Sequence, residues 1–166
     1  GQMLRDQDAR IVTDCLAVLE EIGRADPELI EPFVQEFLHL THSRNNRHVW
    51  QAMINLAMIA ESQADVIYLH QEHLRALTLN GTVIVQDNGV KILARVSRKD
   101  SRSSESLMPF LFGVLRNCRE KSLPQYAESI SPAVNPTNRN DFLAILYHRM
   151  EELSPSQQSR VKKILP

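Results

Sequence analysis

VWQAMINLAMIAESQADVIYLHQEHLRALTL, residues Val49–Leu79, contains the pattern that decides the fold. Its first half carries apolar residues at steps of three and four, the spacing of one helix face. After a short polar break the second half repeats that spacing, with Ile67, His70, Leu74 and Leu77 on one face. The stretch therefore predicts two amphipathic helices joined as a hairpin.

The same pattern recurs 37 residues earlier and 37 residues later. The columns in the first helices are Cys15/Ala52/Gly89, Leu19/Leu56/Leu93 and Ile22/Ile59/Val96, and those in the second helices are Phe33/His70/Leu107, Phe37/Leu74/Leu111 and Leu40/Leu77/Val114. Self-similarity at a fixed spacing, with two helices in each unit, is typical of an α-solenoid. The sequence predicts an all-α, right-handed superhelix of about eight to nine helices, without a β-sheet.

The chain of 166 residues is long enough for one domain with a sizeable core. We expect a single solenoid domain over residues 1–166, with units at about 7–43, 44–81 and 82–121. Residues 122–166 are expected to form a degenerate unit and a terminal helix, which Ser154-Pro155 begins as N-cap and first helical residue.

Several helix boundaries can be predicted from local signals. The first helix is expected from about Gln7 to Ile22, with Gly23 just beyond its end. Asp26-Pro27 is expected to start the second helix, which kinks at Pro32 or begins later. Further on, the helices expected at 64–79 and 83–98 are followed by a polar, mobile break at 99–105 and a helix at about 106–121.

Composition and charge narrow the class of protein. The hydrophobic content of 43% is ordinary for a soluble protein, and the net charge of −1 provides no strong field for nucleic acid or an anionic membrane. The charge is uneven, however, because residues 1–36 are acidic and residues 98–121 are basic. Cys15 and Cys118 belong to different units, so we expect free thiols, a reducing compartment and a cytoplasmic location.

These columns resemble those of HEAT-like or armadillo-type helical repeat proteins. The resemblance covers residues 8–121 well and residues 122–166 loosely, and depends on the small-x-x-x-Leu-x-x-Ile column that includes Ala52, Leu56 and Ile59. Proteins with this repeat mostly act as scaffolds and adaptors. The resemblance therefore implies a protein that presents a surface to a partner, and it implies no cofactor.

Residues with possible chemistry are few. The pairs His39/His42 and His70/His73 have a spacing that could hold a metal ion, but the register predicts that they point to different sides of their helices. No phosphate-binding glycine loop or nucleophile elbow occurs in the sequence. We therefore predict neither a metal site nor catalysis.

The main hypothesis is recognition of a protein or peptide on the second helices, which line the concave side of HEAT-like stacks. The residues opposite or beside the core columns of these helices form the predicted strip. They are Gln35, Leu38, His39, His42, Tyr68, Glu72, Arg75, Leu79, Phe112 and Arg116. This strip includes residue types that are enriched at interface hot spots.

Two alternatives belong to other classes. The first is a nucleic-acid-binding module that uses the basic residues Arg75, Arg98, Lys99, Arg102, Arg116 and Arg119. The second and weaker one is a glycosylase of the DNA alkylation-repair type, a class that also uses HEAT-like stacks. That class uses aromatic residues and an acid on a basic concave face, but here Trp50 is expected to pack between units. Asp87 lies on a first helix and is not assigned to a concave cleft.

Overall fold

The computed structural model describes residues 2–5 and 8–166, so Gln7, where the first helix is predicted to begin, lies outside the described residues. Within the described residues every regular element is a helix. The α-helices are α1 (Ala9–Ala25), α2 (Val34–Leu40), α3 (Asn46–Ile59), α4 (Ala64–Tyr68), α5 (Gln71–Asn80), α6 (Val83–Ser97), α7 (Ser101–Asn117), α8 (Leu123–Ile130), α9 (Arg139–Arg149) and α10 (Pro155–Lys162). The 3₁₀ helices are η1 (Gln2–Arg5), η2 (Pro27–Phe33), η3 (Glu120–Ser122), η4 (Ser131–Ala133) and η5 (Met150–Glu152).

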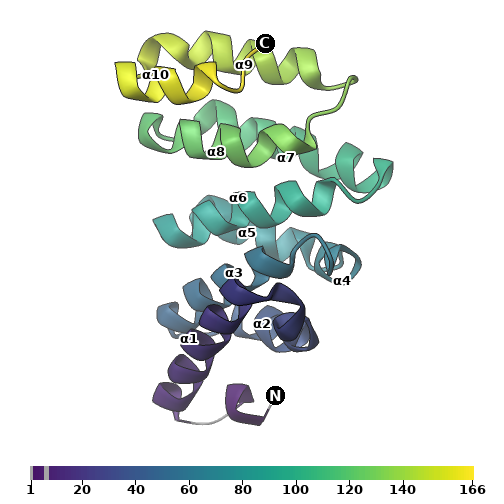
Figure 1. The fold of residues 1–166 in the computed structure, drawn as a ribbon, viewed down its shortest axis with the longest axis vertical. Coiled ribbons are helices and arrows are strands. Elements are labelled where there is room, and N and C mark those ends of the chain that lie inside the picture. Colours follow the sequence, from purple (N-terminus) through teal and green to yellow (C-terminus); the bar gives the residue numbers. More distant parts are fainter. Residues whose placement is uncertain (1, 6–7) are drawn as a thin grey trace.

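The helices stack in two layers from the N-terminal to the C-terminal end (Figure 1). One layer, the first-helix layer, contains α1, α3, α6, α8 and α10, and each of these helices packs on the next. The other, the second-helix layer, contains η2 with α2, α4 with α5, α7, and α9. This arrangement is the predicted all-α superhelical repeat fold.

Two of the predicted core columns are confirmed by burial, whereas Ile22, which was expected in a third, is 36% exposed. Phe37, Leu74 and Leu111 are each fully buried at 37-residue intervals, and so are Leu56 and Leu93 in the first helices. Leu19, the equivalent in the first unit, is half-buried and packs against the same core. The hydrophobic core therefore runs along the stack between the two layers as one continuous cluster.

Polar caps begin several helices where the sequence predicts them. The Asp26 carboxylate accepts a hydrogen bond from the backbone N–H of Glu28 at 3.1 Å, and Pro27 follows as the first residue of η2. Ser154 forms a capping box with Gln157 at the start of α10. Asn88 and Gly89, a turn dipeptide in isolation, lie inside α6 as the register predicts.

Three local predictions are wrong. Gly23 does not end α1, which continues to Ala25; instead the glycine is buried, and a β-carbon there would lie 2.5 Å from Ile30 Cδ1. The predicted break at 99–105 is mostly helix, because the Asp100 carboxylate caps α7 through the backbone N–H of Ser103 at 2.7 Å. The helix expected over 64–79 is divided at Leu69 and His70, since α4 contacts both α2 and α6 whereas α5 packs along α6.

The two layers are not equally tight. Neighbouring helices of the first-helix layer contact each other extensively, whereas neighbouring helices of the second-helix layer touch at few points. A hollow lined by residues of α3, α6, α8 and α10 lies on the first-helix layer. Other hollows involve α5 and α7 of the second-helix layer, so the expected strip is not the one hollow surface among the described residues.

Replacing Leu56 by alanine should reduce the free energy of unfolding by roughly 2–5 kcal/mol, because the side chain is fully buried between units. Leu69→Ala is the matched control, since Leu69 is 81% exposed. Its effect should stay within about 0.5 kcal/mol. Urea denaturation followed by circular dichroism measures both changes, and equal effects would contradict the column assignment.

Gly89 and Gly113 offer a second matched pair, since both lie inside helices. A β-carbon at Gly89 would lie 2.2 Å from Thr78 Oγ1 and 3.0 Å from Thr78 Cβ, so Gly89→Ala should destabilise the protein by about 1–3 kcal/mol. A β-carbon at Gly113 would meet no atom within 4 Å, so Gly113→Ala should stabilise it by about 0.5–1 kcal/mol. Thermal melting distinguishes the two signs.

Candidate functional site

The strip predicted on the second helices is only partly accessible. Leu38 and Phe112 are 2% and 4% exposed, so the prediction that they belong to a presented surface is wrong. Both pack into the core, which the 100° spacing of a regular helix does not reveal where η2 precedes α2. Leu79 is 56% exposed. The other exposed members are Gln35, His39, His42, Glu72 and Arg116, and Tyr68 and Arg75 are half-buried.

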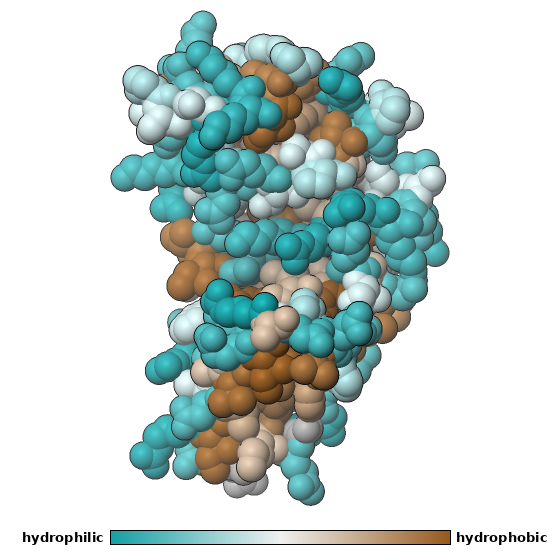
Figure 2. Space-filling view, viewed as in Figure 1, coloured by the Kyte–Doolittle hydropathy of each residue, from teal (hydrophilic) through white to brown (hydrophobic). Residues whose placement is uncertain are grey.

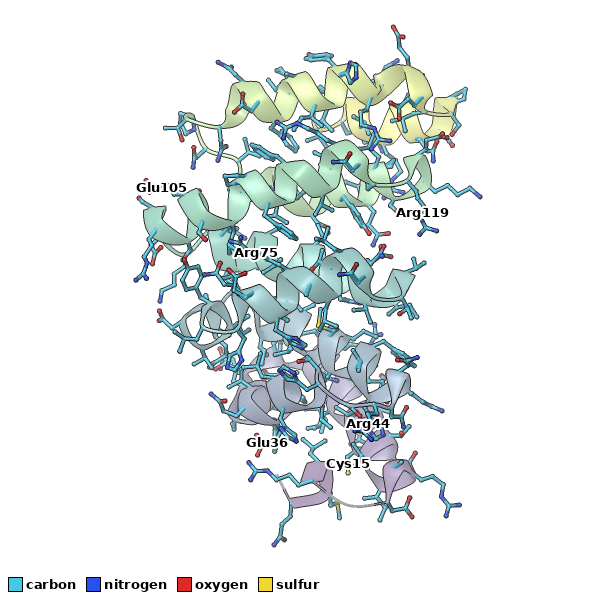
Figure 3. The ribbon with its side chains drawn as sticks, turned by 180° about the vertical axis from the view of Figure 1, so that it is seen from behind. Cys15, Glu36, Arg44, Arg75, Glu105 and Arg119 are labelled. Carbon is cyan, nitrogen blue, oxygen red and sulfur yellow. The ribbon has the colours of Figure 1, made fainter. Side chains whose placement is uncertain are left out.

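Arg75 joins the second unit to the third. Its Nη2 donates to Gln71 Oε1 at 2.8 Å, and to the backbone oxygen and Oγ of Ser106 at 2.9 Å each. The guanidinium also lies 5.3 Å from the centre of the Phe110 ring. Arg75 thus sits between α5 and α7, as Figure 3 shows, and its Nη2 group is engaged within the protein.

Tyr68 takes part in the same contact between units. Hydrogen bonding to Ser106, and then to Gln71, lowers the pKa of its hydroxyl. The Arg102 guanidinium lies 5.8 Å from the centre of its ring. Both predicted hot-spot residues, Tyr68 and Arg75, therefore stabilise the packing of neighbouring second helices.

Two histidines predicted to point apart lie together. The rings of His42 and His73 stack with centroids 3.7 Å apart and an interplanar angle of 12°. The division between α4 and α5 changes the direction of the helix that carries His73, and His73 Nε2 lies 3.0 Å from Thr41 Oγ1. Burial, and then the neighbouring His42, lower the pKa of His73.

One hollow surface crosses four units on the first-helix layer. It has a volume of about 770 Å³. Its wall is formed by Met58 from α3 and Glu61 just after that helix, Lys91 and Arg95 from α6 together with Arg98 directly after it, Gln125, Glu128 and Ser129 from α8, Pro132 from η4, and Arg160 from α10. Because it belongs to no single unit, this surface suits an elongated ligand better than a small compact one.

The face changes character along the stack. On α3, the half-buried side chains of Trp50, Ile54 and Met58 follow one another at single-turn spacing. One unit further, Ile54 and Met58 are replaced in register by Lys91 and Arg95. Figure 2 shows brown atoms gathered over the lower part of this face, at the level of α1 and α3, and teal atoms over the level of α6 and α8.

Ion pairs occupy the two carboxylates of the hollow. Arg98 Nη1 lies 3.1 Å from Glu61 Oε2, and Arg160 donates to both carboxylate oxygens of Glu128 at 2.9 and 2.6 Å. This bidentate hydrogen bonding lowers the pKa of Glu128 and raises the pKa of Arg160. With four cations against two acids, the lining carries a net charge of +2 at neutral pH.

Lys91 and Arg95 are the cations that these pairs leave available. Arg95 Nη1 donates to the backbone oxygen of Ala57, which fixes the guanidinium at the edge of α3. Throughout the part of the chain that the structure describes, the Lys91 ammonium makes neither a hydrogen bond nor an ion pair. The two residues lie one turn apart on α6 and line the same hollow.

The basic residues proposed for nucleic-acid binding do not form one face. Arg98 lines the hollow on the first-helix layer, whereas Arg116 lines the groove between α7 and α9. Arg75 is engaged between units, and Lys99 pairs with Asp65. A phosphate backbone would therefore meet these charges only one or two at a time.

The acid and the aromatic residue considered for glycosylase chemistry are also placed. Trp50 and Asp87 occupy the same column of the first-helix layer, 37 residues apart, and both are half-buried. Burial, and then the neighbouring Asp87 carboxylate, raise the pKa of Tyr126 on α8, so Asp87 is directed at a buried hydroxyl. Residues 2–5 and 8–166 contain no group of three histidines, cysteines or acids that could hold a metal ion. In the same residues no helix is both long and apolar enough to cross a membrane, and both cysteines are free.

Comparison with known proteins identifies the repeat type. The chain superimposes on a designed armadillo repeat protein, YIII(Dq.V1)4CPAF, solved in complex with the peptide (KR)4, with a TM-score of 0.77 at 13% identity, covering 99% of this chain and 78% of that chain. A second designed armadillo repeat protein, YIII(Dq)4CqI, superimposes with a TM-score of 0.73 at 15% identity, covering 96% of this chain and 76% of that chain. A third, computationally designed for modular peptide recognition, has a TM-score of 0.72 at 16% identity, covering 99% of this chain and 78% of that chain.

No family model matches the sequence, and no curated protein matches it. The fold is nevertheless that of an armadillo-type helical repeat protein.

The sequence does contain a signal for the hollow face, but it lies on the first helices and not on the second. Applied to the first helices, the 37-residue register places Ala17, Ile54, Lys91 and Glu128 in one column opposite the core, and Glu21, Met58, Arg95 and Pro132 in another. The period identifies such columns on both layers. The period does not show which layer carries the hollow surface.

The stacked histidines predict an acid-sensitive fold. A pKa of His73 that is lower in the folded than in the unfolded chain means that the unfolded chain binds more protons below about pH 6.5. Stability should therefore be greatest above that pH and fall as pH decreases from 7.5 to 5.5. His73→Gln should flatten this slope. Equal slopes in the variant and the unchanged protein, measured by urea denaturation, would contradict the assignment.

Proposed function

We propose that this protein is a non-enzymatic scaffold that binds an extended segment of a partner protein on the hollow face of its first-helix layer. The observation that carries the proposal is the continuity of the hollow across α3, α6, α8 and α10. A surface that repeats with the units suits a ligand that also extends along the stack, which is how solenoids generally use their inner side.

Two features support a peptide segment as the ligand. The face combines apolar side chains on α3 with charged side chains on α6, the mixture that protein interfaces use for anchoring and orientation. In addition, one similar designed armadillo repeat protein was solved with a peptide, and another was designed for modular peptide recognition. The residues predicted for nucleic-acid binding are scattered over both layers, which weighs against that set as one phosphate-binding face.

Selection of phage-displayed random peptides on the protein tests the proposal, because a random library covers many segment sequences at once. Selected peptides should bind with dissociation constants below about 100 μM, the range of weak but specific segments. Ile54→Ser and Lys91→Glu should each weaken this binding at least tenfold, because both residues lie on the first-helix layer. Circular dichroism melting would verify that both variants remain folded.

The control variants lie on the other layer. Glu72→Lys and Leu79→Ser change exposed residues of α5 that belong to the predicted second-helix strip. Peptide affinity should be unchanged in both. Loss of binding in these two variants but not in the first pair would move the ligand to the second helices, and failure to select any peptide would remove the peptide-binding proposal.

A further inference from the structure

The charges of the hollow favour a ligand that carries negative charge. Its two carboxylates already face cations, because Glu61 pairs with Arg98 and Glu128 pairs with Arg160. Lys163 adds a further positive potential near Glu128 and helps to lower its pKa. The charge presented to a ligand at this level therefore comes from Lys91 and Arg95.

These two cations are positioned to act together. They lie four residues apart on α6, so their side chains project from the same face. The contact of Arg95 with the Ala57 carbonyl uses one of its nitrogens and holds the guanidinium in place, which reduces the entropy lost when a ligand binds. The remaining N–H groups match the acceptors of a carboxylate.

The neighbouring unit supplies the second half of the pattern. In register with Lys91 and Arg95, α3 presents Ile54 and Met58, and Trp50 lies one turn before them. Apolar anchors and cations are thus one helix apart along the stack. Packed helices lie roughly 8–10 Å apart, and an extended chain rises about 3.3 Å per residue, so about three residues of a bound segment separate the two levels.

Resting on the proposed function above, we propose that the segment bound by this face is acidic, and that it carries an aspartate or glutamate about three residues from a large apolar residue. The acidic side chain lies against Lys91 and Arg95 of α6, and the apolar side chain lies against Ile54 and Met58 of α3. A segment with basic residues in place of the acids is repelled from the α6 level.

A set of short fluorescent peptides tests this inference. The first contains two aspartates followed three residues later by two leucines; in the second, lysines replace the aspartates; in the third, serines replace the leucines. Fluorescence anisotropy should show that the first peptide binds at least tenfold more tightly than either of the others. Its affinity should fall when sodium chloride is raised from 50 to 300 mM, because the contact with the cations is screened.

Variants locate the two halves of the contact. Lys91→Glu should weaken binding of the first peptide at least tenfold, and this variant should no longer prefer the first peptide over the lysine peptide. Ile54→Ser should no longer prefer the first peptide over the serine peptide. Arg116→Glu removes an exposed cation from the groove between α7 and α9 and is the matched control, with no expected effect.

The outcomes separate this inference from the proposed function. Equal binding of the aspartate and lysine peptides, or loss of binding in Arg116→Glu, overturns the acidic-segment assignment, even where phage-selected peptides still bind the first-helix layer. Tighter binding of a twelve-nucleotide thymidine strand than of the first peptide also overturns it. If neither these peptides nor phage-selected ones bind, the proposed function itself fails.

Discussion

The direct packing of each first helix on the preceding first helix is the contact on which the rest of the structure depends. It is apolar along Leu56 and Leu93, and it is completed by polar side chains that reach back to backbone oxygens of the neighbouring helix. Asn55 donates to the Leu16 oxygen at 3.3 Å, and Arg95 donates to the Ala57 oxygen. Such directional bonds fix how far one helix can slide along the next, whereas apolar contacts alone tolerate several positions. The hollow face lies on this layer.

The second-helix layer has a different role in this arrangement. Its neighbouring helices touch at few points, and individual clusters bridge the wider spacing, as Arg75 does by reaching Ser106. Tyr68 and the stacked rings of His42 and His73 bridge it in the same way. Large polar and aromatic residues on this layer are therefore explained by the distance they must span. Residue types enriched at interfaces also serve where two repeats of one chain meet loosely.

The sequence was sufficient to predict the repeat, the columns and several caps, because these depend on local spacing that a 37-residue period makes visible. Gly89 is the clearest case, since it shares a column of small residues with Cys15 and Ala52, and the structure contains a close approach between helices there, at Thr78. The errors arose where contacts with neighbouring units or a single cap decide the local helix structure. The division at Leu69 and His70 reflects two different packing partners, and the serines after Asp100 became helical through one cap. Which layer carries a hollow across several units depends on how the helices pack in space, which periodicity does not encode. The hollow face was therefore missed, although its residues were in register.

The hollow face extends over three successive boundaries between units, α3 with α6, α6 with α8, and α8 with α10. Its width is consequently set by the angles at these boundaries and not by the shape of any one unit. Small rotations at each boundary would add along the stack, so bending of the stack would open or narrow the face. A ligand in contact with both ends of the face would hold those angles and make the stack harder to bend. Conversely, a force that straightens or bends the stack from outside would change how tightly that ligand is held.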